Sequence, residues 1–159
     1  MLTFHAESPP TPAFDYATWE RVFNTSLDDQ DARISGDEIR RLDTRIAPHI
    51  YTRRVLVYEN GEVVGCALSN HLIYLFNPGL LWIWVAVLPE HRGRGLGAKI
   101  FDEMLTTLRG AVVPESLMSH AKENAPHTLE FLERRGFVMR QRFVPSCLRL
   151  ERADFGQLP

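Results

Sequence analysis

The sequence has few features that would assign it to a specialised protein class. It has two cysteines, Cys66 and Cys147, too few for a disulfide framework and not spaced as a zinc or redox pair. The formal net charge is −2, so no overall field attracts nucleic acid or anionic lipid. The longest apolar stretch, residues 79–88, is too short to cross a bilayer, and no signal peptide is evident. We therefore expect a cytoplasmic protein that binds neither nucleic acid nor membrane.

The chain does have the size and balance of one globular domain. Its 159 residues are 45% hydrophobic and 24% charged, which suits a single core, so we expect one domain over residues 1–159.

An acidic run at Asp28, Asp29 and Asp31 is typical of a calcium loop. However, Arg33 and Ile34 occupy positions where such a loop needs an acid and a glycine, so we predict no metal site.

Helical spacing of apolar residues predicts four helices. Ser35 with Glu38 predicts a capping box at the start of the second, and Gly136 ends the last. The expected ranges are residues 14–27, 36–46, 95–109 and 125–135.

Strands are expected between and after these helices. The Asn60-Gly61 dipeptide predicts a tight hairpin, because both turn positions need a positive φ. The segment LLWIWVAVL is apolar on both alternating faces, as in a central strand covered by helices on both sides. The expected strands cover residues 1–7, 53–58, 63–68, 72–76, 80–88 and 115–121, with one or two more within 137–150. This order predicts an α/β fold with a mixed sheet.

A turn rich in glycine and arginine follows the apolar strand. The N-terminus of a helix has unpartnered backbone N–H groups and a partial positive charge, so it favours an anion. Gly93, Gly95 and Gly97 let a bulky group approach the backbone, and Arg92 and Arg94 can add charge-assisted hydrogen bonds. The turn therefore predicts a diphosphate site.

Two well-known phosphate-binding motifs fit this turn poorly. A Walker loop needs Gly-Lys-Ser/Thr, whereas Lys99 lies between Ala98 and Ile100. Gly93, Gly95 and Ala98 match a dinucleotide pattern, but the turn follows an antiparallel hairpin instead of opening a parallel β-α-β unit. A dinucleotide-dependent oxidoreductase is therefore the least favoured interpretation.

The pattern R-x-x-G-x-G, formed by Arg92, Gly95 and Gly97, resembles the coenzyme-binding turn of the GNAT superfamily of N-acetyltransferases. The segment FLERRGF, residues 131–137, is similar to that family's second coenzyme segment. The order of elements over residues 53–150 also matches. The resemblance implies an α/β (α+β) GNAT fold with a central mixed, mostly antiparallel sheet, splayed central strands and helices on both faces.

The resemblance also implies acetyl-CoA as cosubstrate and a primary amine, on a small molecule or a peptide, as acceptor. The backbone of Val85, Ala86 and Val87 would pair with the pantetheine arm. Asn124 resembles the family's asparagine that meets the same arm. The pyrophosphate would be held by the turn, namely by Arg92, Gly93, Arg94, Gly95, Leu96, Gly97 and Ala98.

The groups that handle protons in many members of that family are missing. Leu132 stands where a general-acid tyrosine is common, and the apolar strand has no glutamate to act as base. The substitutes that the sequence offers are His71, His120 and His127. The alternative is a catalytically weak or inactive GNAT domain that binds coenzyme A or serves as a structural module, as a homodimer or with a second GNAT domain.

The resemblance places the acceptor side at the first helices and their connection, residues 14–51. The acidic run in that connection suits either a cationic amine or a solvated loop. We expect Trp82 and Trp84 to pack in the sheet core, with lining of the acceptor site as the alternative.

Overall fold

A computed structural model describes residues 1–7, 11, 13–27 and 33–143 of the chain. It divides into two compact units, Met1–His120 and Ala121–Pro159, which are described separately. The acidic run at Asp28, Asp29 and Asp31 and the second cysteine, Cys147, lie outside the described residues.

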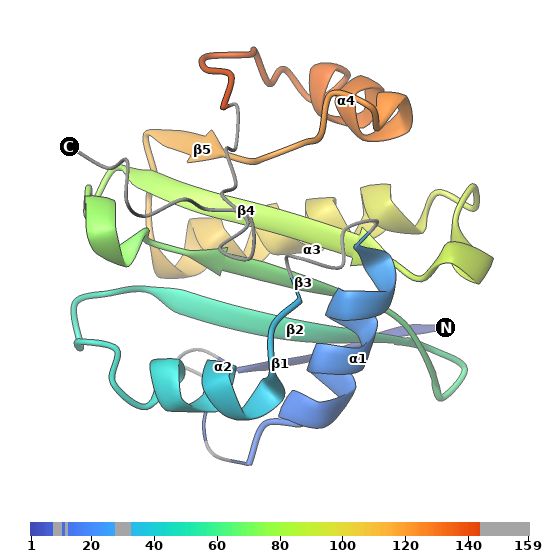
Figure 1. Cartoon of the computed structure of the whole chain (residues 1–159), viewed down its shortest axis with the longest axis horizontal. Coiled ribbons are helices and arrows are strands. Elements are labelled where there is room, and N and C mark those ends of the chain that lie inside the picture. Colours follow the sequence, from blue (N-terminus) through green and yellow to red (C-terminus); the bar gives the residue numbers. More distant parts are fainter. Residues whose placement is uncertain (8–10, 12, 28–32, 144–159) are drawn as a thin grey trace, which may run out of the picture. The chain divides into compact units, whose positions relative to one another are not determined.

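The first unit is built on a five-stranded sheet in the order β1-β2-β3-β4-β5 (Figure 1). The first four strands are antiparallel neighbours, and β5 is parallel to β4. This arrangement confirms the predicted mixed, mostly antiparallel sheet. The strands are β1 (Leu2–Glu7), β2 (Thr52–Glu59), β3 (Glu62–Asn70), β4 (Leu80–Val87) and β5 (Ser116–Met118).

The hairpin between β2 and β3 forms as its sequence predicts. Asn60 and Gly61 have φ of 53° and 88°, which is the backbone conformation that a two-residue hairpin turn requires. The predicted antiparallel pairing of β2 with β3 is confirmed by their register.

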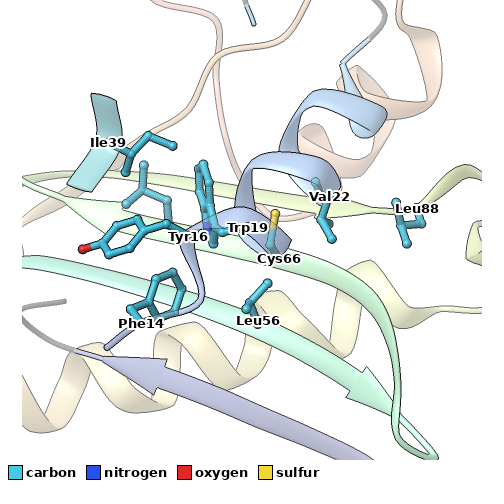
Figure 2. Close-up of a cluster of buried hydrophobic side chains, with 10 residues drawn as sticks. Phe14, Tyr16, Trp19, Val22, Ile39, Leu56, Cys66 and Leu88 are labelled. Carbon is cyan, nitrogen blue, oxygen red and sulfur yellow. The ribbon is translucent and has the colours of Figure 1, made fainter. Parts of the chain in front are cut away.

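Helices cover both faces of the sheet (Figure 1). On one face lie α1 (Tyr16–Ser26) and α2 (Gly36–Asp43), and on the other α3 (Leu96–Ala111) lies against β3 and β4. Because alternate strand residues point to opposite faces, β2 contributes buried side chains to the core on each face of the sheet. Leu56 joins the cluster beneath α1, where Trp19 and Val22 are buried (Figure 2). The core residues of α3 are Leu96, Ile100, Phe101, Met104 and Leu108.

The second unit contains α4 (Pro126–Glu133). Phe137 N–H donates to Leu132 O and Gly136 N–H donates to Glu133 O, at 3.1 and 2.9 Å, while Gly136 has φ of 80°. These bonds form a Schellman motif, which glycine favours because of its positive φ. The predicted end of this helix at Gly136 is confirmed.

One predicted strand does not form, and another is absent from the described part of its range. Residues 72–76 form a 3₁₀ turn, η2 (Ile73–Leu75), because the chain reverses there between β3 and β4 and has no strand to pair with. His71 N–H still donates to Tyr51 O at 2.9 Å, and this is where the pairing ends. Residues 137–143 contain no strand, and residues 144–150 lie outside the described part.

The capping box predicted for α2 is also wrong. Ser35 is the N-cap residue, but its side chain makes no capping hydrogen bond. Instead, Gly36 N–H donates to the carboxylate of Glu20 on α1 at 2.7 Å. A carboxylate from the neighbouring helix therefore meets the free N–H at this helix start, which the local sequence could not reveal.

A buried ion pair joins the two helices on this face to the sheet. The Arg54 guanidinium on β2 donates to both carboxylate oxygens of Asp43, at 2.6 and 2.8 Å, and the two side chains are 10% and 1% exposed. Tyr16 donates its hydroxyl hydrogen to Asp43 at 3.1 Å. The Arg54 guanidinium also lies over the Trp19 ring, 4.8 Å from its centroid. One carboxylate thus connects α1, α2 and β2.

We expect Arg54→Met to lower the free energy of unfolding by about 3–5 kcal/mol, because it leaves the buried Asp43 carboxylate without its counter-ion. Urea unfolding followed by circular dichroism measures the loss. The double variant Asp43→Asn/Arg54→Met removes both charges and should recover more than half of it. A loss below about 1 kcal/mol in the single variant would contradict a stabilising role for this contact.

Alkaline pH should destabilise the fold through Tyr16. Burial raises the pKa of the Tyr16 hydroxyl, and the adjacent Asp43 carboxylate raises it further. The unfolded chain loses this proton near its usual pKa of about 10, whereas the folded chain retains it, so stability falls as pH rises above that value. Urea unfolding between pH 8 and 11 should show a smaller decline for Tyr16→Phe, and equal declines would argue against this origin.

Candidate functional site

The two halves of strand β4 have different partners, and only Trp82 pairs with both β3 and β5. The strand pairs with β5 from Leu80 to Trp82, and β5 ends at Met118, the residue opposite Trp82. Pairing with β3 continues from Trp82 to Val87. No strand among the described residues pairs with the other side of Val85–Val87, so backbone groups on that edge are available to an extended ligand.

The glycine turn comes directly after this edge. A 3₁₀ turn, η3 (Pro89–His91), leads into it, and Gly93 and Gly95 each have φ of 74°. A Cβ on either glycine would meet nothing within 4 Å, so the backbone conformation, and not crowding, favours glycine here. Gly95 lies at the end of the turn, where it is the N-cap residue of α3.

The start of α3 presents free backbone donors. The first bond into the helix runs from Lys99 N–H to Gly95 O at 3.3 Å. The N–H groups of Leu96, Gly97 and Ala98 have no hydrogen-bond partner among the described residues. No acidic side chain occupies the first turn of the helix. This arrangement suits a phosphate, because the donors and the helix dipole act together.

Both arginines of the turn are held by other parts of the protein. Arg92 donates to the backbone oxygens of Val87 at 3.1 Å and Ser26 at 3.3 Å. Arg94 donates to the Glu59 carboxylate at 2.7 Å, and its other terminal nitrogen lies 3.2 Å from His91 Nδ1. No sequence pattern indicates the Ser26 contact, since the partner is a main-chain oxygen 66 residues away.

The histidines proposed as substitutes for the missing acid and base have different surroundings. His71 is 4% exposed, accepts the Tyr51 N–H at Nδ1 (3.0 Å) and has Nε2 3.4 Å from Pro78 O. Both ring nitrogens therefore serve the backbone, and the geometry favours a structural role. His127 is exposed on α4, in the second unit.

His120 lies beside the separation of β4 and β5. It comes two residues after Met118, and its ring centroid is 5.4 Å from that of Trp82, the last β4 residue paired with β5. His120 is also exposed. Of the three histidines, it is the one that lies where the pairing of β4 with β5 ends.

The two tryptophans of β4 pack against the core beneath α1, as the sequence predicts. The Trp84 ring lies 4.5 Å from that of Phe23 and 6.4 Å from that of Trp19, centroid to centroid. Trp82 Nε1 and the Oδ1 atom of Asn70, the residue opposite it on β3, are buried without a hydrogen-bond partner among the described residues. The Trp82 N–H donor and the Asn70 oxygen acceptor therefore make the surroundings of Trp82 more polar than the apolar sequence of β4 indicates.

The remaining residues taken from the resemblance lie in the second unit. Asn124 is exposed two residues before α4, and Leu132 is half-buried within the helix. The described residues contain no cluster of histidine, cysteine, aspartate or glutamate able to hold a metal. No helix in the described part is long and apolar enough to cross a membrane.

Several solved structures share this fold. An aminoglycoside acetyltransferase from an uncultured soil metagenomic sample has 19% identity and a TM-score of 0.64, covering 94% of this chain and 99% of its own. The ribosomal-protein-S18-alanine N-acetyltransferase of Escherichia coli has 13% identity and a TM-score of 0.63, covering 89% and 80%. The structure of AAC(6')-Iy in complex with a CoA-containing bisubstrate analog has 15% identity and a TM-score of 0.58, covering 92% and 99%. At these identities the likeness establishes the fold.

The family assignment comes from the sequence itself. No curated protein matches the chain at a significant level. The acetyltransferase (GNAT) domain family matches residues 51–139, which is more than half of the chain and includes β2 to β5, the glycine turn and α4. The chain therefore belongs to the GNAT family of acetyltransferases.

Proposed function

We propose that this protein transfers an acetyl group from acetyl-CoA to a primary amine. One observation carries the proposal: the open edge of β4 is followed, through η3 and the glycine turn, by a helix start with free N–H donors. An extended arm can pair with the edge while a diphosphate occupies the turn. Acetyl-CoA has both parts in one molecule, and it brings the acetyl thioester that a GNAT enzyme transfers.

The backbone of Val85, Ala86 and Val87 would bind the pantetheine arm. A main-chain N–H at this edge would also donate to the thioester oxygen. Loss of one such donor typically raises the activation free energy by about 3–4 kcal/mol. The turn from Arg92 to Ala98 would hold the pyrophosphate, chiefly through the free N–H groups of the helix start. Asn124 is proposed as a further contact of the arm.

The reaction needs a base for the amine and a proton for the departing thiolate. His120 is our candidate base, because it lies where β4 and β5 separate. The tyrosine that serves many relatives as acid is replaced by Leu132, so the thiolate would take its proton from solvent or from the base after deprotonation of the amine. Positioning and polarisation of the thioester would supply most of the rate.

A second candidate function is a coenzyme-binding domain with little or no activity. Leu132 and the absence of any acid in β4 favour it. Such a domain would pair with a copy of itself or with a second GNAT domain. Calorimetry with acetyl-CoA, followed by a thiol-release assay over a broad panel of amines, separates the two functions, since tight binding without turnover favours the inactive domain.

The acceptor is proposed as a small-molecule or peptide amine. The structural neighbours support either, since by name one acts on aminoglycosides and another on an alanine of ribosomal protein S18. The amine panel should therefore contain aminoglycosides, polyamines and peptides with a free N-terminus.

Gly95→Asp should weaken acetyl-CoA binding at least 100-fold, because it adds a negative charge at the phosphate site and strains a position whose φ is 74°. Calorimetry measures the affinity, and circular dichroism checks the fold. Gly110→Asp adds the same charge near the other end of α3, where a new side chain meets nothing within 4 Å. It should bind acetyl-CoA like the wild type, and equal binding by Gly95→Asp would remove the proposed site.

His120→Gln should lower kcat by about 10²–10⁴, the usual contribution of a general base, and leave the Kd of acetyl-CoA unchanged. The matched control is His5→Gln on the edge strand β1, where the ring pairs only with Tyr58 among the aromatic side chains described. Steady-state thiol release with any active amine measures kcat for both variants, and calorimetry measures the Kd of acetyl-CoA. A His120→Gln enzyme within threefold of wild type would exclude His120 as the base.

A further inference from the structure

The side chain of Arg92 lies at the junction of three parts of the first unit. It belongs to the glycine turn, its Nε–H donates to the last residue of β4, and its Nη2 donates to Ser26 O at the last residue of α1. These bonds use two of the five N–H donors of a guanidinium. Three remain for a phosphate, so anion binding does not require either contact to break.

The end of α1 lacks a cation of its own. The last four carbonyls of a helix have no intrahelical partner and carry a partial negative charge, which a basic residue in the last turn usually offsets. The last turn of α1 contains no basic residue. Arg92, brought from 66 residues away, supplies both a hydrogen-bond donor and a positive charge there.

The same helix end is connected to α2. The side chain of Asn24 makes two bonds with the backbone of Ile34, accepting its N–H at 3.1 Å and donating to its oxygen at 3.0 Å. Ile34 lies two residues before α2 begins at Gly36, which in turn is bonded to Glu20 of α1. The contacts therefore run from the glycine turn through Arg92 to the end of α1 and on to α2.

We propose that Arg92 is a positioning residue that couples coenzyme binding to the helices on the acceptor side. A diphosphate in the turn orders the Arg92 guanidinium, which in turn stabilises the Ser26 carbonyl and the last turn of α1. The sign of the coupling is positive, because one guanidinium can serve the phosphate and both carbonyls together. This inference rests on the proposed function, since it takes acetyl-CoA as the ligand of the turn.

The other arginine of the turn provides the contrast. Arg94 is bonded to Glu59 at the end of β2, and its contacts do not reach α1. Breaking that ion pair loosens the turn on the side of the hairpin but leaves the connection from Arg92 to Ser26 intact. Glu59→Gln is therefore a matched control for changes at Arg92.

Amide hydrogen exchange with and without saturating acetyl-CoA tests the coupling. In the wild type, bound acetyl-CoA should slow exchange over residues 23–27 by about two- to fivefold, the size of a charge interaction at a helix end. Arg92→Lys keeps the positive charge near the phosphates, but one ammonium cannot reproduce the fork to both carbonyls. It should still reach saturation, at a higher concentration of acetyl-CoA because Arg92 belongs to the phosphate site, and lose the slowing, whereas Glu59→Gln should retain the slowing.

The outcomes separate this inference from the proposed function. Equal slowing in Arg92→Lys and wild type at saturation, or no slowing in a wild type that binds acetyl-CoA, overturns the coupling. A wild type that fails to bind acetyl-CoA overturns the proposed function instead. In that case the ligand-free comparison still decides the anchoring role, since Arg92→Lys should then exchange faster than wild type over residues 23–27 and an equal rate overturns it.

Discussion

The separation of β4 from β5 is the constraint on which the rest of the site depends. Strand β5 pairs with β4 over only three residues, from Leu80 to Trp82, while β3 holds the other side of β4 as far as Val87. The edge of β4 is thus open but not loose, because it remains fixed to β3 and is supported from behind by α3. The proposed extended ligand would meet a row of backbone groups that β3 already holds in place and that leads toward the glycine turn. The binding geometry would then exist before the ligand arrives, which reduces the entropy cost of binding.

The helices on the other face are held to this frame by polar contacts at a few points. Asp43 connects α1, α2 and β2 through Arg54 and Tyr16. Glu20 and Asn24 of α1 bond to the backbone at the start of α2 and just before it. Each contact gives a hydrogen-bond partner to a polar group that is partly or fully buried or that lies at a helix end. Polar side chains in this fold thus act mainly as connections between elements, and the apolar cluster beneath α1 supplies the burial.

Local patterns predicted most elements of the fold. The hairpin at Asn60-Gly61 and the helix that ends at Gly136 were predicted because their turns need a positive φ, which few residue types tolerate. The strand predicted at residues 72–76 was wrong because its apolar residues had no neighbouring strand to pair with, and three of them, Ile73, Tyr74 and Phe76, are instead exposed. The predicted capping box is absent for a related reason, since the Glu20 carboxylate of α1 accepts the Gly36 N–H at the helix start. Pairing partners are decided between elements, and a local window of sequence does not contain them.

Residue types and their spacing are enough to specify the chemistry that can be assembled: a glycine turn at a helix start, an apolar strand before it, and no acid in that strand. These follow from residue type and spacing, because φ preferences and helix-end donors are local properties. The partners of the charged side chains, by contrast, are set by the folded chain. Arg92 and Arg94 were expected at a phosphate, yet the fold brings the Ser26 carbonyl and the Glu59 carboxylate to them, and it separates a buried, fully bonded His71 from an exposed His120 beside Trp82. The physical reason is that hydrogen bonds and ion pairs depend on distances between segments remote in sequence, which exist only once the sheet has formed.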